Sequence, residues 1–318
     1  MISQRVLSFI AGCVVAAAAC ADYPEKPVRI VVGFTPGGGP DITARFLAQE
    51  LGAIWKQQVI VENRPGAGGS LGAAQVAKSA PDGYTLLSVS SAHAAAPAIY
   101  SKLPYDTKEL AGVTLTGSSK YVLVVSPSLG ISSLSQLLRA VKEKPGTFNF
   151  SSAGVGSGTH FAGEILKARA AIDVVHVPFK GIPEALSETM TGRVQFFMAP
   201  IANAVGPLKD GRLVALAVSS HERDALLPQV PTVEEAGVPG YESTLWFGLL
   251  TSAAVPRALV EKISADAGKV LASAATRERW LPIGIEPRPT TPARFDELIR
   301  NDLRQFSEIA RGANIRAE

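Results

Sequence analysis

The chain has 318 residues, of which 47% are hydrophobic and 19% are charged, and its formal net charge is +3. The 31 basic residues form no basic tract, which argues against nucleic acid as a partner. The length is enough for two lobes of ordinary domain size, and after the N-terminus no apolar run reaches membrane-spanning length.

The first 21 residues have the layout of a secretory signal peptide. Arg5 carries a positive charge, an apolar run covers residues 6–19, and small residues at 19–21 favour cleavage before Asp22. We therefore predict that residues 1–21 are removed and that the mature protein is periplasmic.

A lipoprotein signal is the alternative interpretation of the same segment. Residues 10–13 read Ile-Ala-Gly-Cys and resemble a lipobox, which would attach Cys13 to a lipid. Both cysteines, Cys13 and Cys20, lie in the segment that cleavage before Asp22 removes. The mature chain would then contain no cysteine, so it would need no disulfide in an oxidising compartment.

Short β-rich runs alternate with helical stretches from Asp22 to about residue 218. The near-continuous apolar run Val28–Phe34 predicts a strand buried on both faces, and apolar residues at helical spacing within 42–55 predict a helix after it. This alternation is typical of α/β units with parallel sheets, whose ligands gather at the carboxyl ends of the strands. From Pro256 the chain is mostly helical. The remaining predicted elements are strands at 59–61, 84–89, 121–125, 148–151, 174–177, 194–198 and 213–218, and helices at 71–79 and 134–141.

The loop Thr35–Asp41 follows the first predicted strand and reads TPGGGPD. Its three glycines allow the backbone to approach a ligand closely, and the N-terminus of the following helix favours an anion. For Asp41 we prefer a structural interpretation, because an acidic residue in a first helical turn already complements the helix dipole.

The loop Ser151–His160 reads SSAGVGSGTH and has the same position after a strand and before a helix. Ser157, Thr159 and His160 are its candidate polar contacts, although His160 fits equally well as a capping or core histidine. Two anion-receiving loops in separate halves of the chain suggest a ligand held between two lobes by backbone amides and hydroxyls.

The segment Gly68–Gly72 matches GxSxG and gives the best enzyme signal, a serine hydrolase that uses Ser70. Residues 64–67 intervene after the preceding strand, so the strained strand-to-helix elbow is not expected here. The four histidines, the only candidate bases, have no telling spacing and form no metal motif: they are His93, His160, His176 and His221. We therefore expect no enzyme activity, no metal and no cofactor, and keep the secreted hydrolase as the alternative.

Motifs along the whole mature chain resemble the Bug/TctC family of extracytoplasmic solute-binding receptors, which are associated with tripartite tricarboxylate transporters. The resemblance runs from Tyr23 to the C-terminus. In chain order the motifs are YPEKPVRIVVGFTPGGGPDITAR, VIVENRPGAGGSLGA, APDGYTLL, LPYD, SAGVGSGTH, VPFKG, LAVSSHER, VPTVEEAG and GIEP.

The resemblance implies an α/β protein with the type II periplasmic-binding-protein fold, in which crossing strands join two lobes around a cleft. We place the crossings near Tyr121–Ser126 and Tyr241–Thr251. The expected organisation is a signal peptide at 1–21, the first part of lobe 1 at 22–121, lobe 2 at 122–245, and a mostly helical return to lobe 1 at 246–318.

The family holds carboxylates mainly through backbone amides, hydroxyls and bridging waters of the cleft loops. Carried over to this chain, the implied ligand-binding residues are Phe34, Gly38, Gly39, Ser90, Ser91, His93, Gly156, Ser157, Thr159, His160, Phe179 and Gln195. Three of them depart from the family's usual residues. Gly39 stands where serine is frequent, Phe179 where tyrosine is usual, and Gln195 where aspartate is common. We interpret Gln195 as a cleft residue that disfavours ligands with an ammonium group.

The sequence thus predicts a monomeric receptor that captures a small carboxylate between two lobes. Its expected partner is the membrane permease of a tripartite tricarboxylate transporter. The alternative is a receptor that serves in sensing and does not meet a permease.

Overall fold

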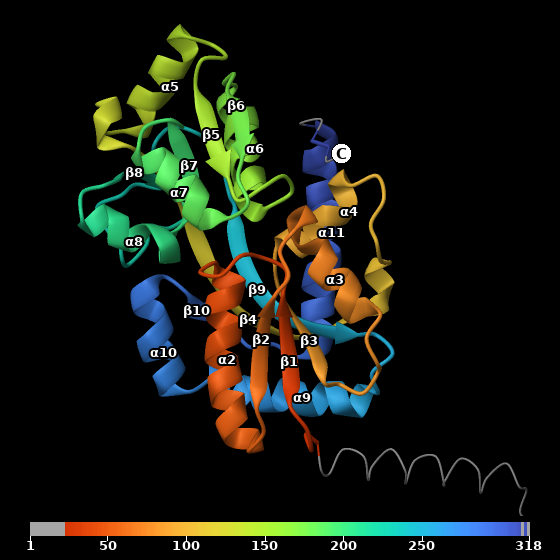
Figure 1. Ribbon diagram of the computed structural model, residues 1–318. Coiled ribbons are helices and arrows are strands. Elements are labelled where there is room, and N and C mark those ends of the chain that lie inside the picture. Colours follow the sequence, from red (N-terminus) through yellow and green to blue (C-terminus); the bar gives the residue numbers. More distant parts are fainter. Residues whose placement is uncertain (1–22, 313–314, 317–318) are drawn as a thin grey trace, which may run out of the picture.

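The computed structural model describes residues 23–312 and 315–316, so the predicted signal peptide and both cysteines lie outside the described residues. The chain forms two α/β lobes, one above the other in Figure 1, and long strands connect them. Each lobe has a mixed β-sheet with helices on both faces.

Lobe 1 contains the N-terminal segments and the C-terminal helices. Its strand order is β2-β1-β3-β9-β4, and β10 pairs with β4 at the far side. Its strands are β1 (Val28–Val32), β2 (Val59–Asn63), β3 (Thr85–Ser90), β9 (Thr244–Ser252), β10 (Glu286–Pro287) and the first part of β4 (Leu110–Val125). Its helices are α2 (Gly39–Trp55), α3 (Ser70–Ala77), α4 (Ala92–Ile99), α9 (Arg257–Leu271), α10 (Ala274–Trp280) and α11 (Pro292–Gly312).

Lobe 2 is built around the second part of β4. There β4 lies between β8 and β7, and the order continues through β5 to β6. The strands are β5 (Asn149–Ser152), β6 (Val175–Pro178), β7 (Phe196–Pro200) and β8 (Val214–Val218). The helices are α5 (Leu134–Glu143), α6 (Gly158–Ala170), α7 (Ile182–Met190) and α8 (Ile201–Lys209).

Strand β4 passes from one lobe into the other without a break. Lys120 still pairs with Thr244 of β9 in lobe 1, whereas Tyr121 pairs with Pro200 of β7 in lobe 2. Both pairings are antiparallel, while β1, β2 and β3 pair in parallel, as do β5, β6 and β7. The sheets are therefore mixed, and the parallel pattern predicted from the alternation is wrong for β4 and β8, while the antiparallel β9 and β10 lie beyond the residues that the alternation covers.

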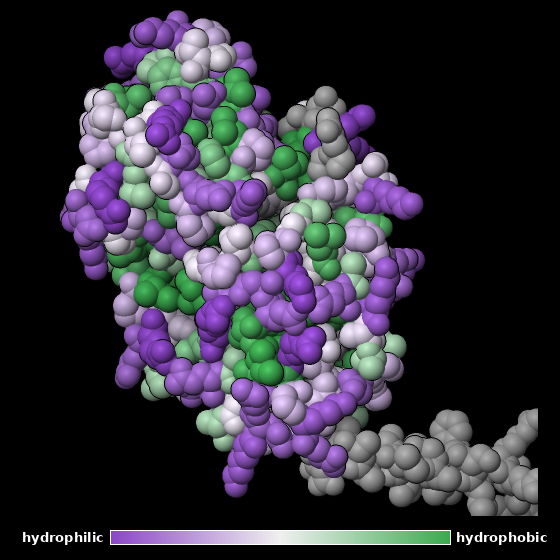
Figure 2. Space-filling view, viewed as in Figure 1, coloured by the Kyte–Doolittle hydropathy of each residue, from purple (hydrophilic) through white to green (hydrophobic). Residues whose placement is uncertain are grey.

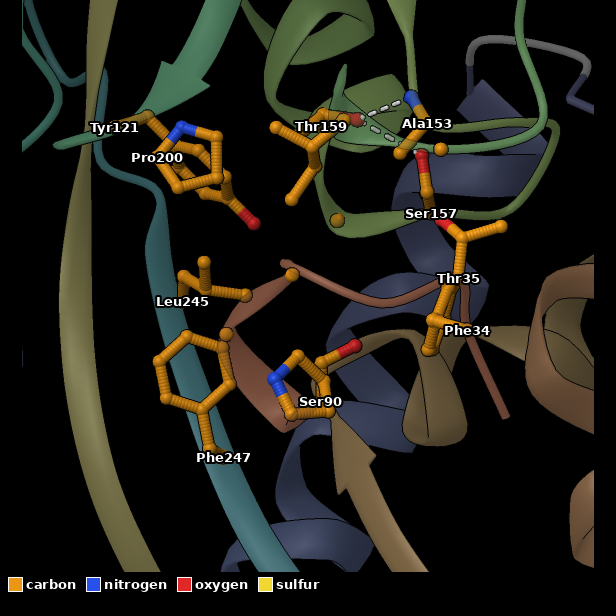
Figure 3. Close-up of a pocket in the computed structure, with 16 residues that line it drawn as sticks. Phe34, Thr35, Ser90, Tyr121, Ala153, Ser157, Thr159, Pro200, Leu245 and Phe247 are labelled. Atoms are coloured by element: carbon orange, nitrogen blue, oxygen red, sulfur yellow. Dashed lines mark hydrogen bonds between the residues drawn. The ribbon is translucent and has the colours of Figure 1, made fainter. Parts of the chain in front are cut away.

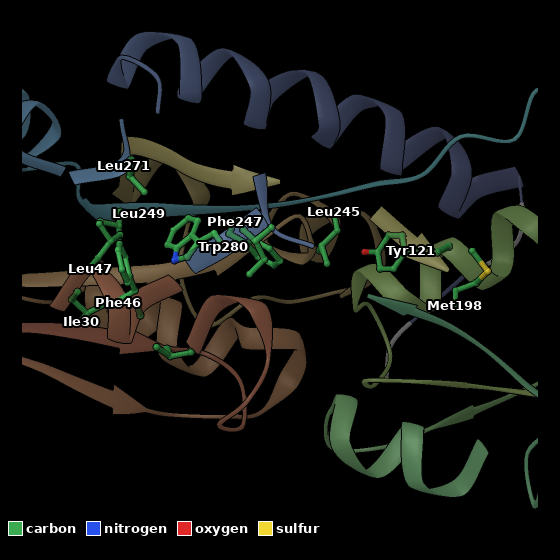
Figure 4. Close-up of a cluster of buried hydrophobic side chains, with 14 of the residues drawn as sticks. Ile30, Phe46, Leu47, Tyr121, Met198, Leu245, Phe247, Leu249, Leu271 and Trp280 are labelled. Atoms are coloured by element: carbon green, nitrogen blue, oxygen red, sulfur yellow. The ribbon is translucent and has the colours of Figure 1, made fainter. Parts of the chain in front are cut away.

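The core of each lobe lies between its sheet and its helices. In lobe 1, Ile30 of β1 is fully buried and packs in one cluster with Leu47 of α2 and Trp280 of α10 (Figure 4). Burial of such aliphatic and aromatic side chains removes about 1.5–3 kcal/mol of unfavourable hydration each. The predicted first strand exists but ends at Val32 rather than Phe34, so Phe34 leaves the sheet and reaches the cleft.

Hydrophilic side chains cover most of the face seen in Figure 2. Among residues 23–312, none of the helices combines the length and the apolar character needed to cross a bilayer.

Candidate functional site

A cavity lies between the lobes at the carboxyl ends of β1, β3, β5 and β7. We call it the inner chamber; it holds about 440 Å³ of unfilled space, including its mouth. Figure 3 shows Tyr121, Leu245 and Phe247 of the crossing strands on one side, with Phe34 and Thr35 on the other. The lining residues are Phe34, Thr35, Gly38, Gly39, Pro40, Ser90, Tyr121, Ala153, Ser157, Gly158, Thr159, Gly181, Ile182, Pro200, Leu245 and Phe247.

Four helices begin at the wall of the inner chamber. The N-cap residues of α2, α6, α7 and α8 are Gly38, Ser157, Gly181 and Pro200, and all four line it. The first N–H groups of a helix have no partner inside the helix, and the helix dipole adds positive partial charge there. None of the lining side chains is charged. The chamber therefore attracts an anion through backbone groups and neutral hydroxyls, without a charged side chain.

Asp41 fixes the glycine loop of lobe 1. Its Oδ2 accepts hydrogen bonds from the Gly37 N–H and from Arg45 Nε, both at 3.0 Å, and its Oδ1 accepts one from Asn63 Nδ2 at 2.9 Å. The same amide nitrogen donates to the Phe34 carbonyl at 3.0 Å. Burial alone would raise the pKa of Asp41, but the hydrogen bonds from Arg45, Gly37 and Asn63 lower this pKa overall. Asp41 thus stays ionised and holds the loop, as its structural interpretation predicts.

Hydroxyl groups and one histidine hold the loop of lobe 2. Ser157 Oγ accepts the His160 N–H and caps α6, and Thr159 Oγ1 accepts the Ala153 N–H at 2.9 Å. His160 lies behind the loop, where its Nδ1 accepts the Gly156 N–H at 3.2 Å. Burial, with a smaller contribution from nearby Lys167, lowers the pKa of His160 to about 4, so its ring is neutral at pH 7.

Tyr121 is a site residue that the sequence analysis missed. Its phenol points into the inner chamber (Figure 3), its side chain is buried, and its hydroxyl makes no hydrogen bond of standard geometry among the described residues, although the Ser91 hydroxyl lies beside it. Burial raises the pKa of this phenol and the neighbouring Ser91 hydroxyl opposes this only weakly, so the phenol stays neutral and can donate a hydrogen bond. The sequence analysis places a lobe crossing near Tyr121–Ser126, but nothing in the sequence indicates that the Tyr121 side chain points into the cleft.

Half of the predicted ligand-binding residues line the inner chamber: Phe34, Gly38, Gly39, Ser90, Ser157 and Thr159. Phe179 lines an adjoining cavity, described below, and His93 lines a small cavity behind Phe34 and Ser90. Ser91 is buried, and its hydroxyl has no partner within the described part of the chain. Gly156 and His160 support the loop from behind.

The structure places Gln195 away from the inner chamber. This residue precedes the first residue of β7, and its Oε1 accepts the backbone N–H of Asn149 at 2.8 Å. The chamber adjoins Pro200 at the other end of the same strand, roughly 16 Å away at the usual rise per residue. The interpretation of Gln195 as a cleft residue that selects against ammonium groups is therefore wrong.

Ser70 is also not placed for nucleophilic chemistry. It is the first residue of α3, it is buried, and its hydroxyl has no hydrogen-bond partner among the described residues. An active serine needs a base within hydrogen-bond reach. His93 lines the same small cavity, but its ring nitrogen contacts the hydroxyl of Tyr105 at 3.4 Å. Residues 23–312 and 315–316 contain no cluster of acidic, histidine or cysteine side chains suited to a metal ion.

Comparison with known proteins identifies close relatives of the chain. Residues 43–315 match the model of the tripartite tricarboxylate transporter family receptor, TctC. Protein BugT of Bordetella pertussis is 32% identical, and the alignment covers 95% of this chain and 94% of BugT.

Two solved structures have the same fold. One is Rpa4515 of R. palustris, solved with adipate, at 28% identity and a TM-score of 0.89 over 92% of this chain and 99% of that one. The other is MatC of Rhodopseudomonas palustris, solved with bound malate, at 31% identity and a TM-score of 0.85 over 90% of this chain and 99% of that one.

Proposed function

Because the chain belongs to the TctC family of tripartite tricarboxylate transporter receptors, we propose that its inner chamber binds a carboxylate group of a small organic acid. Members of this family are solute-binding receptors rather than enzymes, and the serine-hydrolase alternative has no support. Adipate and malate, found in two of the related structures, indicate the size and chemistry of acid to test first.

The observation that carries the proposal is the meeting of four helix N-termini in a chamber without a charged side chain. A carboxylate is compact and singly charged, so several backbone N–H groups and hydroxyls can share its two oxygens. No acidic side chain lines the chamber to repel it.

The proposed contacts come from both lobes. In lobe 1 they are the backbone at Phe34, Gly38 and Gly39 and the hydroxyl of Ser90; in lobe 2 they are Ser157 and Thr159. Tyr121 adds a phenol from the crossing strand. We assign His160 and Gly156 to support of the lobe 2 loop, and Ser91 and His93 to the layer behind the chamber.

A thermal-shift and calorimetric screen of succinate, malate, adipate and benzoate tests the proposal. A ligand that binds only the folded chain stabilises it by about 2.7 kcal/mol at a hundredfold excess over Kd. Uncharged succinamide serves as the control, because it carries no negative charge for the helix N-termini to stabilise. The proposal fails if no organic acid in a broad screen raises the midpoint above the amide control.

Gly38→Val shows whether binding occurs in this chamber. The backbone of Gly38 has an ordinary φ of −79°, and a Cβ there would lie 3.8 Å from its nearest neighbours. Valine is therefore compatible with the fold but projects into the chamber, so we expect a folded variant that has lost binding. Gly206→Val, at an exposed position of α8 with open space around it, is the matched control.

Export and delivery complete the proposal. The family acts outside the cytoplasm, and we propose that residues 1–21 are removed before the receptor passes its ligand to a tripartite tricarboxylate permease. Intact-mass analysis of the periplasmic fraction should give a chain that begins at Asp22. A retained N-terminus, or a diacylated Cys13, would contradict this part.

A further inference from the structure

A second cavity adjoins the inner chamber at Phe34 and Thr35, which lie opposite the crossing strands in Figure 3. We call it the outer chamber; it holds about 820 Å³ of unfilled space, including its mouth. Both lobes contribute to it, and three residues line both chambers: Phe34, Thr35 and Ala153.

Glycine keeps this space open. Gly66, Gly68, Gly69 and Gly154 all have positive φ, where a side chain would be strained. A Cβ on Gly33 would come within 2.8 Å of the Gly69 backbone, so the loop 65–69 can approach β1 only at glycine. The outer chamber is thus bounded by backbone and by apolar side chains, among them Pro65, Val155 and Phe179.

Lys180 is the basic side chain of the outer chamber, and the other lining residues are uncharged. It is exposed and follows Phe179 in the loop before α7. The carboxylate of Glu184 accepts the backbone N–H of Lys180 at 3.1 Å and lies outside the lining. A mostly apolar chamber with one cationic side chain therefore adjoins the anion-binding inner chamber.

We propose that the ligand is an elongated acid with two anionic ends and an apolar body. This rests on the proposed function: one carboxylate lies at the helix N-termini of the inner chamber. The body then passes Phe34 into the outer chamber, and the second anionic group lies near Lys180. The outer chamber is thus the subsite that selects ligand length and distal charge.

Calorimetry with succinate, suberate and octanoate tests this subsite, since the three acids separate chain length from distal charge. Lys180→Gln should weaken suberate about two- to fivefold, the scale of an exposed ion pair. Octanoate and succinate should be unaffected, because one lacks the distal charge and the other lacks the length. Lys209→Gln, an exposed lysine at the end of α8, is the matched control and should change none of the three.

Val155→Phe tests the apolar lining of the outer chamber independently. The larger ring fills part of the outer chamber, so suberate and octanoate should weaken together by at least tenfold while succinate keeps its affinity. Retained succinate binding also shows that this variant is folded.

The inference is overturned if Lys180→Gln shifts all three acids alike or shifts none. It is also overturned if the wild-type chain binds succinate but not suberate, an outcome that leaves the proposed function standing. A chain that binds none of the three overturns the inference as well, and the broader acid screen then decides whether the proposed function falls with it.

Discussion

The buried phenol of Tyr121 differs from an ordinary core tyrosine because its hydroxyl faces the inner chamber and, apart from the neighbouring Ser91 hydroxyl, makes no hydrogen bond of standard geometry among the described residues. A buried hydroxyl without a hydrogen bond costs about 1–3 kcal/mol, and this cost is recovered when a ligand accepts from it. Tyr121→Phe should therefore leave the free energy of unfolding unchanged or slightly higher, while ligand affinity falls about two- to tenfold. Denaturant titration and calorimetry on the same variant measure both quantities.

Tyr241→Phe is the control for Tyr121, because Tyr241 is equally buried but its hydroxyl donates to the Ala162 carbonyl at 3.0 Å. That variant should lose about 1 kcal/mol of stability and keep its affinity. A Tyr121→Phe variant with the same pattern would show that the phenol is structural and makes no ligand contact.

Gly39 has a physical explanation that the sequence did not offer. A Cβ at this position would lie 2.1 Å from Cζ of Phe247, so the ring occupies the space that a serine would need. Gly39→Ser alone should destabilise the fold by about 1–3 kcal/mol, as overpacked cores do. Gly39→Ser combined with Phe247→Ala should lose less stability than the sum of the single changes, and a double-mutant cycle measures the difference. Additive losses of stability would show that residues 39 and 247 do not interact and would contradict this explanation.

At the residue scale, the sequence located residues where a motif fixes the backbone and misplaced one whose role came from the resemblance alone. Gly38 and Ser157 line the inner chamber, and glycine-rich turns before helices are the signal that points to them. Gln195 lies just before β7, at the end of that strand away from the chamber, as the predicted strand at 194–198 and the rule that ligands gather at carboxyl ends already imply.

At the element scale, the largest difference is β4, which begins at Leu110 instead of Tyr121. Its first part contains Gly112 and Gly117, which weaken a strand pattern. Close approach explains both: a Cβ on Gly117 would lie 2.8 Å from the Glu286 carbonyl of β10, and one on Gly112 would lie 2.7 Å from Asp296 Oδ1. These partners are far along the chain, so local sequence does not reveal the reason.

Lobe 2 also contains a stacked pair of histidines, His160 of α6 and His176 of β6. The rings of His160 and His176 lie 3.9 Å apart between their centroids, and His176 Nε2 is 2.6 Å from Ser152 Oγ. Burial, then the neighbouring His160 and Lys167, lowers the pKa of His176 to about 3. Burial likewise lowers the pKa of His93 in lobe 1 to about 4.

These histidines predict a loss of stability in mild acid. Each has a pKa below the unfolded value near 6.5, so between pH 7 and pH 5.5 the unfolded chain binds protons that the folded chain does not. The expected loss is about 1 kcal/mol per histidine over that interval. His160→Gln keeps an acceptor for the Gly156 N–H and should reduce the total loss by about that amount, measured by denaturant titration at pH 7, 6 and 5.5.

His221 is the control for this pH dependence. It is exposed, and hydrogen bonds and charge from Glu242 and Glu234 raise its pKa, so its effect has the opposite sign: stability is gained as the pH falls. His221→Gln should therefore steepen the acid loss slightly. If His160→Gln also steepens it, the buried histidine is already protonated in the folded chain and the argument is wrong.

At the scale of the whole molecule, the two lobes meet at several places among the described residues. Strands β4 and β9 join them behind the inner chamber. Helix α11 packs against α4 of lobe 1, and its Phe306 ring lies 4.8 Å from Phe161 of α6 in lobe 2. At the cleft itself, Asn203 of α8 donates to the Gly37 carbonyl at 2.9 Å, and Tyr100 donates to the Val155 carbonyl at 3.5 Å. Opening the cleft must break the two hydrogen bonds of the last group.

The Asn203 to Gly37 hydrogen bond is therefore the contact that ties closure to the anion-binding loop. Its loss should shift the chain toward the open form by about 0.5–1.5 kcal/mol, the usual net value of a neutral hydrogen bond. Asn203 does not line the inner chamber, so Asn203→Ala should weaken every bound acid by the same factor, about two- to tenfold. The change should appear in the dissociation rate, because the closed complex opens more readily, and stopped-flow fluorescence and calorimetry measure it. Asn301→Ala on the exposed face of α11 should change neither quantity. If Asn203→Ala weakens one acid and spares another, Asn203 contacts the ligand directly and is not a closure contact.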